Sequence, residues 1–216
     1  MMVDACKKKN MMSIWLIVWC LFFTQSSFAA NAASAESLVK ITGITPDQKV
    51  AEKIVPGLLP LYYLDFFQRD LKKLPQGSSA KYPSFRGEAI LELNHTFGRG
   101  EVFASGAKQG VGMRLQGYLL FAEPGEYSLQ AMSNDGIIMQ LDGVQVLSDP
   151  KQHSDRLTEM AQVVINHPGW YPVVIEYFQR KGTATLQLLW KTPGSSDVEP
   201  IPASAYGHVS SPEKGM

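Results

Sequence analysis

Cysteine is almost absent from this sequence of 216 residues. The two cysteines, Cys6 and Cys20, both lie within the first 29 residues. If these residues are removed on export, no disulfide, thiolate nucleophile or cysteine metal site can form in the rest of the chain. The folded protein must then be stable through its hydrophobic core alone, even in a compartment that permits disulfides.

An excess of charge is also missing, since 20 Lys and Arg residues balance 20 Asp and Glu residues. A nucleic-acid partner requires a basic face, and the neutral total gives no indication of one. Charged residues make up 19% of the chain and hydrophobic residues 45%, which is typical of a globular protein. We therefore predict a globular protein with no nucleic-acid partner.

A hydrophobic run of membrane-spanning length is missing as well. The apolar run Ile14–Phe23 has ten residues, whereas a transmembrane helix needs about 20. It follows Lys7–Lys9 and precedes small residues that allow cleavage after Ala29 or Ala32. This layout predicts a secretory signal peptide over residues 1–29, the alternative being an uncleaved anchor. We expect an exported protein, periplasmic or secreted, with no membrane span in the mature chain.

Helical periodicity is missing too, whereas alternation of apolar and polar residues is frequent. Alternation with a period of two is typical of a sheet that packs one face on a core. The turn sequences Pro-Gly, Asn-Asp-Gly and Asp-Gly separate the alternating segments. Several short strands joined in this way predict an all-β fold, an antiparallel β-sandwich or barrel. The clearest segments are Val111–Phe121, Tyr127–Met132, Ile137–Leu141, Ala161–Ile165, Tyr171–Tyr177 and Ala184–Trp190.

The strands predict one domain over residues 56–206, because no internal repeat and no linker interrupts this region. Pro56-Gly57 marks the predicted start of the domain. Residues 30–55 are polar and rich in small residues, so we expect a flexible N-terminal segment there, in which residues 37–44 form either a short strand or a tail. Residues 207–216 are expected to form a C-terminal tail.

A series of motifs resembles, in the same order, motifs of the PA14 domain family. The resemblance covers about Gly57–Tyr206 and implies an extracytoplasmic β-sandwich of jelly-roll character. The family is found within toxins, glycosidases, proteases and adhesins, and many of its members bind carbohydrate. The similar motifs are Gly57–Tyr63, Val111–Phe121, Pro124–Tyr127, Ser133–Gly143, Pro168–Tyr177, Ala184–Trp190 and Glu199–Pro202.

The resemblance also implies a binding site. In the sugar-binding adhesins of the family, two consecutive aspartates joined by a cis peptide bind calcium, and a second loop adds an asparagine side chain and backbone carbonyls. The ion then coordinates sugar hydroxyl groups. Calcium suits this role because it takes six to eight oxygen ligands and tolerates neutral, exchangeable ones.

In this sequence the aspartate pair corresponds to Asn134-Asp135, and the second-loop asparagine corresponds to a position near Gln179. By the resemblance, Asn134, Asp135 and Gln179 are candidate calcium ligands and, with Arg180, candidate carbohydrate-binding residues. One carboxylate of the pair is lost, and Arg180 and Lys181 would repel a cation if they pointed inward. Calcium is therefore the single candidate cofactor, and only the resemblance implies it.

Patterns of catalytic residues are missing. The four histidines show no ligand spacing for zinc. No nucleophile elbow surrounds a serine, and no glycine loop that binds phosphate precedes a helix. We therefore predict that the protein is not an enzyme.

Two functions from different classes remain open. The first is an extracytoplasmic module that binds a glycan near Asn134-Asp135 and the loop that begins at Gln179, where Trp170 and Tyr171 are candidate aromatic faces for a sugar ring. The second is a structural or protein-interaction domain of the cell envelope, in which these loops are only turns. A sugar binder should expose polar and aromatic groups beside Asp135, whereas an interaction domain should expose an apolar patch or strand edge.

Overall fold

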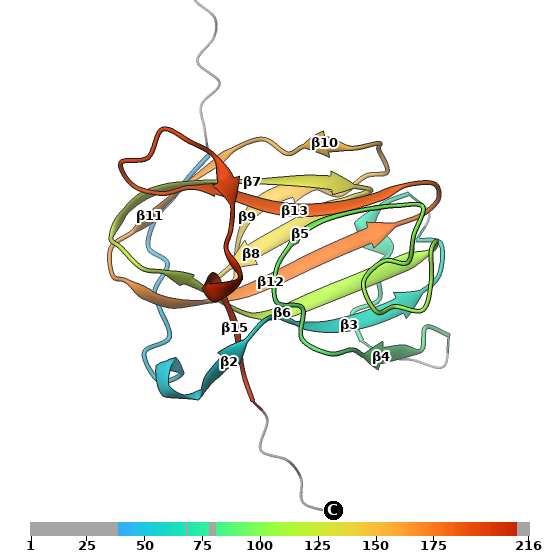
Figure 1. The fold of residues 1–216 in the computed structure, drawn as a ribbon, viewed down its shortest axis with the longest axis horizontal. Coiled ribbons are helices and arrows are strands. Elements are labelled where there is room, and N and C mark those ends of the chain that lie inside the picture. The colour runs from blue at the N-terminus through green and yellow to red at the C-terminus, as the bar shows by residue number, and fades with distance from the viewer. Residues whose placement is uncertain (1–38, 68, 78–80, 211–216) are drawn as a thin grey trace, which may run out of the picture. The chain divides into compact units, whose positions relative to one another are not determined.

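The structure is a computed structural model that describes residues 39–67, 69–77 and 81–210 (Figure 1). Fifteen strands and three short 3-10 helices lie in these ranges. The predicted signal peptide, residues 1–29, lies outside them. None of the helices in the described ranges has the length and apolar character to cross a membrane. The 3-10 helices are Ala51–Lys53 (η1), Leu71–Lys73 (η2) and Ala203–Ala205 (η3).

The first of two sheets has seven strands in the order β1-β11-β7-β13-β14, with β10 beside β7 and β5 beside β13. All its pairings are antiparallel except that of β1 with β11. Its strands are Val39–Ile41 (β1), Asn94–Gly98 (β5), Gly125–Asn134 (β7), Arg156–Leu157 (β10), Ala161–Ile165 (β11), Ala184–Lys191 (β13) and Glu199–Pro200 (β14).

The second sheet has eight strands in the order β2-β15-β6-β12-β8-β9, with β3 paired to both β6 and β4. Every pairing in this sheet is antiparallel. Its strands are Ile54–Pro56 (β2), Leu59–Leu64 (β3), Ser84–Arg86 (β4), Val111–Phe121 (β6), Ile137–Leu141 (β8), Val144–Asp149 (β9), Gly169–Gln179 (β12) and Tyr206–Val209 (β15).

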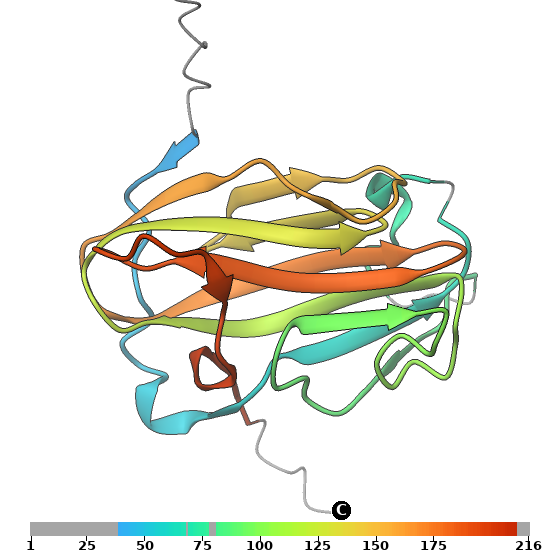
Figure 2. The ribbon, with the colours of Figure 1, turned by 45° about the horizontal axis from the view of Figure 1, so that its top comes forward.

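The two sheets form two layers with a common hydrophobic core between them (Figure 2). Strand β12 pairs with β6 over its whole length, from Gly169 opposite Phe121 to Gln179 opposite Val111. Alternate side chains of the central strands enter the core, and each contributes about 1.5 to 3 kcal/mol by leaving water. The prediction of an all-β sandwich is confirmed. Core residues of β12 and β13 include Tyr171, Val173, Ile175, Tyr177, Leu186 and Leu188.

The folded unit begins earlier in the chain than predicted. The prediction of a flexible segment over residues 30–55 is wrong for the part that the structure describes, since β1 pairs with β11 and β2 pairs with β15. Ile41, Ile44 and Val50 are buried, and the Thr45 backbone N–H donates to the Asp142 carboxylate. The apolar residues of this segment show no period, so the pattern left a strand over residues 37–44 as one alternative and did not predict β2.

The predicted C-terminal tail, residues 207–216, also begins inside the sheet. Strand β15 continues to Val209 and pairs with β2 through Gly207, His208 and Val209. A side chain on Gly207 would meet Ile54 and the Trp170 ring, so only glycine allows this close approach. Residues 211–216 lie outside the described ranges.

The buried position of Ile44 leads to a direct test. Ile44→Ala should lower the free energy of unfolding by about 2 to 5 kcal/mol, because it removes a core side chain and leaves a cavity. Leu91→Ala is the matched control, since Leu91 is 55% exposed and should change the stability by less than about 1 kcal/mol. Urea unfolding followed by tryptophan fluorescence measures both. Equal midpoints for the two variants would show that residues 39–55 do not pack on the core.

Candidate functional site

A hollow of about 750 Å³ lies at the end of the sandwich where β7 ends and β12 turns back into β13. Five segments that are distant in sequence meet there. The eleven lining residues are Arg69, Arg99, Asn134, Asp135, Lys151, Gln152, His153, Ser154, Lys181, Gly182 and Thr183.

Asn134 and Asp135 lie at the inner side of this hollow, joined by a cis peptide bond. The Asp135 backbone N–H donates to the Phe178 carbonyl at 3.0 Å, and the Phe178 N–H donates to the Gly136 carbonyl at 3.1 Å. The buried Tyr177 hydroxyl donates to the Asn134 carbonyl at 2.6 Å. The end of β7 is therefore held against the end of β12 by three hydrogen bonds.

The side chain of Asn134 joins two further segments to this pair. Its amide nitrogen donates to Asp155 Oδ1 at 2.8 Å and to Thr183 Oγ1 at 2.9 Å. Asp155 belongs to the segment after β9, and Thr183 belongs to the turn between β12 and β13. The Asn134 amide, a candidate calcium ligand by sequence, thus holds the segment after β9 and the turn between β12 and β13 at the hollow.

The carboxylate of Asp135 is almost fully buried, with 1% of the residue exposed. Its Oδ2 accepts a hydrogen bond of 2.6 Å from the backbone N–H of Arg180. Burial raises the pKa of this carboxyl, and backbone hydrogen bonds from Arg180 and His153 oppose the rise. Asp135 therefore acts as a hydrogen-bond acceptor between two loops.

The structure does not bring the other two predicted site residues into the hollow. Gln179 is fully buried on the core-facing side of β12, two residues beyond Tyr177. Its side-chain amide atoms have no hydrogen-bond partner among the described residues. Arg180 contributes its backbone N–H to Asp135, while its guanidinium lies 5.7 Å from the centre of the Phe66 ring.

The two candidate aromatic faces lie at the other end of β12. Trp170 and Tyr171 are the second and third residues of this strand, whereas its last residue, Gln179, precedes the lining residues Lys181–Thr183. Tyr171 is fully buried and its hydroxyl donates to the His167 carbonyl at 2.7 Å. Neither residue is among those that line the hollow, because alternation along β12 carries Tyr171 into the core and Trp170 packs beside Gly207.

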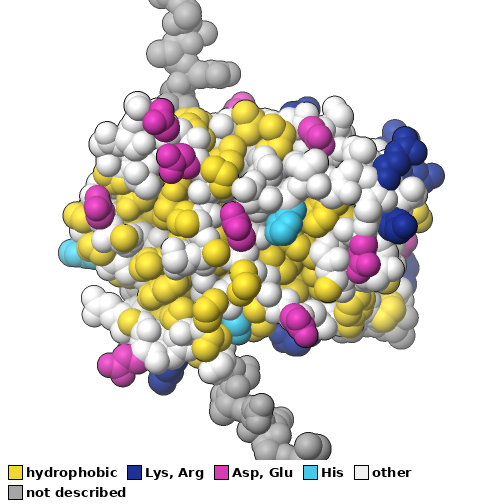
Figure 3. Space-filling model, in the orientation of Figure 1, with side chains coloured by type: hydrophobic (Ala, Val, Ile, Leu, Met, Phe, Trp, Pro, Cys, Tyr) yellow, Lys and Arg dark blue, Asp and Glu magenta, His cyan; other side chains and the backbone are white. Residues whose placement is uncertain are grey.

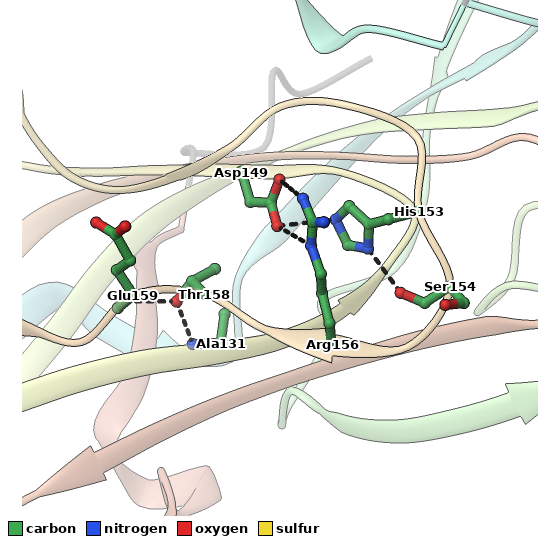
Figure 4. Close-up of polar contacts among 7 residues, drawn as sticks. All are labelled: Ala131, Asp149, His153, Ser154, Arg156, Thr158 and Glu159. Atoms are coloured by element: carbon green, nitrogen blue, oxygen red, sulfur yellow. Dashed lines mark hydrogen bonds and ion pairs between the residues drawn. The ribbon is translucent and has the colours of Figure 1, made fainter.

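The segment after β9, which forms one wall, is held by a cluster around Asp149 (Figure 4). Arg156 donates two hydrogen bonds to the Asp149 carboxylate, at 2.7 and 2.6 Å. His153 Nε2 lies 3.1 Å from the same carboxylate, and His153 Nδ1 lies 2.7 Å from the Ser154 carbonyl oxygen. These contacts position the four consecutive lining residues Lys151–Ser154.

Sequence reasoning missed most of the cations in this hollow. Lys181 was noted beside the site, but Arg69, Arg99 and Lys151 come from three other segments. Each stands in a loop with no motif around it, and only the assembled fold brings them together. Lys and Arg side chains gather at this end of the sandwich, at the right of Figure 3.

The residues at this position do not fit a calcium ion. Calcium prefers six to eight oxygen ligands, including carboxylates, whereas the hollow offers one carboxylate that already accepts backbone hydrogen bonds. Gln179 points elsewhere, and four Lys and Arg side chains line the same space. Their charge would repel a divalent cation.

The family model of the PA14 domain matches residues 82–204. The chain belongs to the PA14 domain family. The comparison with curated proteins gives no match.

Several solved structures share the fold of this PA14 domain. An anti-sigma factor domain-containing protein is 22% identical, with a TM-score of 0.58 over 73% of this chain and 49% of that chain. The PA14 domain of the antifreeze protein MpAFP is 18% identical, with a TM-score of 0.56 over 78% of this chain and 96% of that chain. The A domain of epithelial adhesin 9 from Candida glabrata was solved in complex with Galb1-3GlcNAc. It is 13% identical, with a TM-score of 0.58 over 80% of this chain and 96% of that chain. This chain spans about half the length of the first of these proteins.

The raised pKa of Asp135 predicts a pH-dependent difference in stability. In the folded protein this carboxyl holds its proton more tightly than in the unfolded chain, so its contribution is largest below about pH 3.9 and is lost as the pH rises through the raised pKa. Asp135→Asn keeps an acceptor oxygen but does not titrate. The stability of this variant relative to the wild type should therefore increase with pH in urea unfolding between about pH 3 and pH 7.

Tyr177→Phe is the control for this experiment. It removes the hydroxyl that donates to Asn134, at a cost of about 1 to 3 kcal/mol. Burial raises the pKa of Tyr177 well above its ordinary value, so the phenol stays neutral over the tested range. The loss should thus be independent of pH. A stability of Asp135→Asn that decreases with pH, relative to the wild type, would show that charges in the hollow stabilise the carboxylate overall.

Proposed function

We propose that this PA14 domain is a non-catalytic, extracytoplasmic carbohydrate-binding module whose site is the hollow beside Asn134-Asp135. The observation that carries the proposal is the assembly of five segments around that pair. The family resemblance implies a sugar site at the same pair. In the family's adhesins the sugar is bound through a calcium ion, which the residues of this chain do not fit. A sugar would here be held by protein groups directly.

The rim of the hollow has the chemistry that a sugar requires. Ser154 and Thr183 offer hydroxyl groups, and Gln152 offers an amide, all on loops at the surface. Hydroxyl and amide groups both donate and accept hydrogen bonds, as sugar hydroxyls do. A polar, open hollow held by rigid strand ends suits a ligand rich in hydroxyl groups.

Further support comes from the fold neighbours and from the sequence. The adhesin 9 domain was solved with the disaccharide Galb1-3GlcNAc, so the same fold holds a sugar in a protein of different sequence. The predicted signal peptide over residues 1–29 and the lack of cysteine after Cys20 support export to the periplasm or the medium. We infer a glycan partner, in the cell envelope or outside the cell.

One observation favours the second candidate function, a protein-interaction domain of the cell envelope. Strand β4 pairs only with β3 among the described strands, so it is an edge of the second sheet. Phe85 in this strand is 40% exposed, and nearby Leu64 is 50% exposed. An edge strand with exposed apolar side chains can pair with another protein.

The proposed site is tested by filling the hollow. Ser154→Trp should place a large ring in it and reduce binding to any glycan found on an array at least about 10-fold, because the ring occupies the ligand's position. Calorimetric titration with that glycan measures the loss. Ser196→Trp is the control, since Ser196 is exposed in the loop after β13, at the opposite end of the sandwich. Equal affinity of the two variants would place the site elsewhere, and β4 would then be tested next.

A further inference from the structure

The hollow concentrates positive charge in a protein whose net charge is zero. Four of its eleven lining residues are Lys or Arg, namely Arg69, Arg99, Lys151 and Lys181. We call these four side chains the basic cluster. The single acid among the lining residues is Asp135, whose carboxylate already accepts backbone hydrogen bonds.

No ion pair within the described part of the chain involves the basic cluster. The pairs found there are Lys40–Glu126, Arg114–Glu176 and the contacts of Asp149 with His153 and Arg156. All four side chains of the cluster belong to exposed residues. Among the described residues no carboxylate forms an ion pair with these four charges, and a concave surface with unpaired positive charge attracts anions.

The backbone fixes two members of the basic cluster relative to each other. Gln152 donates its backbone N–H to the Arg69 carbonyl at 3.0 Å, and Leu71 donates to the Pro150 carbonyl at 2.8 Å. Asp70 and Lys151 form an antiparallel bridge between the same two segments. Arg69 therefore lies opposite Gln152, and Lys151 lies opposite Asp70, on a paired backbone.

The other two members are also placed by ordered neighbours. Lys181 lies over the Phe66 ring, with its Nζ 5.5 Å from the ring centre, which orients the ammonium group by a cation–π contact. Arg99 directly follows Gly98, which pairs with Ala184 at the start of β13. The backbone positions of all four residues are thus set by the fold.

We propose that the basic cluster makes this hollow a site for acidic glycans, which it holds through their carboxylate or sulfate groups without calcium. The inference rests on the proposed function and names its ligand class. Arg and Lys form strong, charge-assisted hydrogen bonds with such anions. Ser154, Thr183 and Gln152 are left to bind the hydroxyl groups, and this combination favours an acidic sugar over an acidic peptide.

The experiment uses the full-length protein with a chelator present and four probes of similar size. The first is a tetragalacturonate, and the second is the same oligosaccharide with its carboxyl groups reduced to alcohols. The third is a heparin tetrasaccharide, which carries sulfate groups, and the fourth is a tetraglutamate peptide. At least one acidic glycan should bind about 10-fold or more tightly than the reduced one, because several cations face its charges. This preference should weaken as salt is added.

Variants test the cluster itself. The double variant Lys151→Gln, Lys181→Gln should weaken binding of the preferred acidic glycan about 10-fold, since it removes two of the four facing charges. Lys49→Gln, Lys53→Gln removes the same charge around η1, near Trp170 at the opposite end of β12, and should leave the affinity within about 2-fold. Thermal unfolding verifies that both variants remain folded.

Each outcome separates this inference from the proposed function. Equal affinity for the tetragalacturonate and its reduced form would overturn the acidic preference and support neutral sugar binding. Equal affinity for tetraglutamate and the acidic glycans would contradict a carbohydrate site altogether. If binding required calcium and the double variant of Lys151 and Lys181 left the affinity unchanged, the inference would be wrong. The family's calcium-bridged sugar site would then be supported instead. Tighter binding of the heparin tetrasaccharide, which carries sulfate groups beside its carboxylates, than of tetragalacturonate would show that sulfate adds to the recognition.

Discussion

The unbroken pairing of β12 with β6 is the constraint on which the rest of this molecule depends. Eleven consecutive residues of β12 face residues of β6, and five of them also pair with β8. One side of the strand supplies core residues from Tyr171 to Tyr177, and its end supplies the backbone that receives Asp135. Fold and site thus share a strand, since the register that buries Tyr177 also sets the position of the hollow.

The end of this strand is joined to two loops by polar contacts of the buried residues Asn134 and Asp135. Asn134 contacts the Tyr177 hydroxyl, Asp155 and Thr183, while Asp135 accepts hydrogen bonds from the backbone of Arg180 and His153. A buried polar network of this kind is stabilising only when its members are satisfied. In this chain the pair that resembles the family's metal ligands is used largely to hold loops together.

Sequence reasoning predicted the central strands because their alternation is long and their turns contain Gly, Pro, Asn and Asp. It left β1, a parallel strand of three residues, as one of two alternatives for residues 37–44, since so short a segment shows no period. The pair Asn134-Asp135 was found through its family motif, and the structure places both residues in the hollow. Gln179 was assigned by its place in the loop, but strand alternation directs it into the core. Arg69, Arg99 and Lys151 carry no local signal, because only the tertiary fold brings them together.

Around the hollow, the residues that carry charge differ from the residues that hold the loops in place. The basic side chains stand on exposed loop positions, whereas the contacts that hold the loops come from strand ends and buried amides. Replacing one exposed side chain by another leaves those contacts in place and costs little free energy of folding. The charge that the hollow presents and the thermodynamic stability of the domain are therefore separable in this protein, and the lining can change without a change in the sandwich.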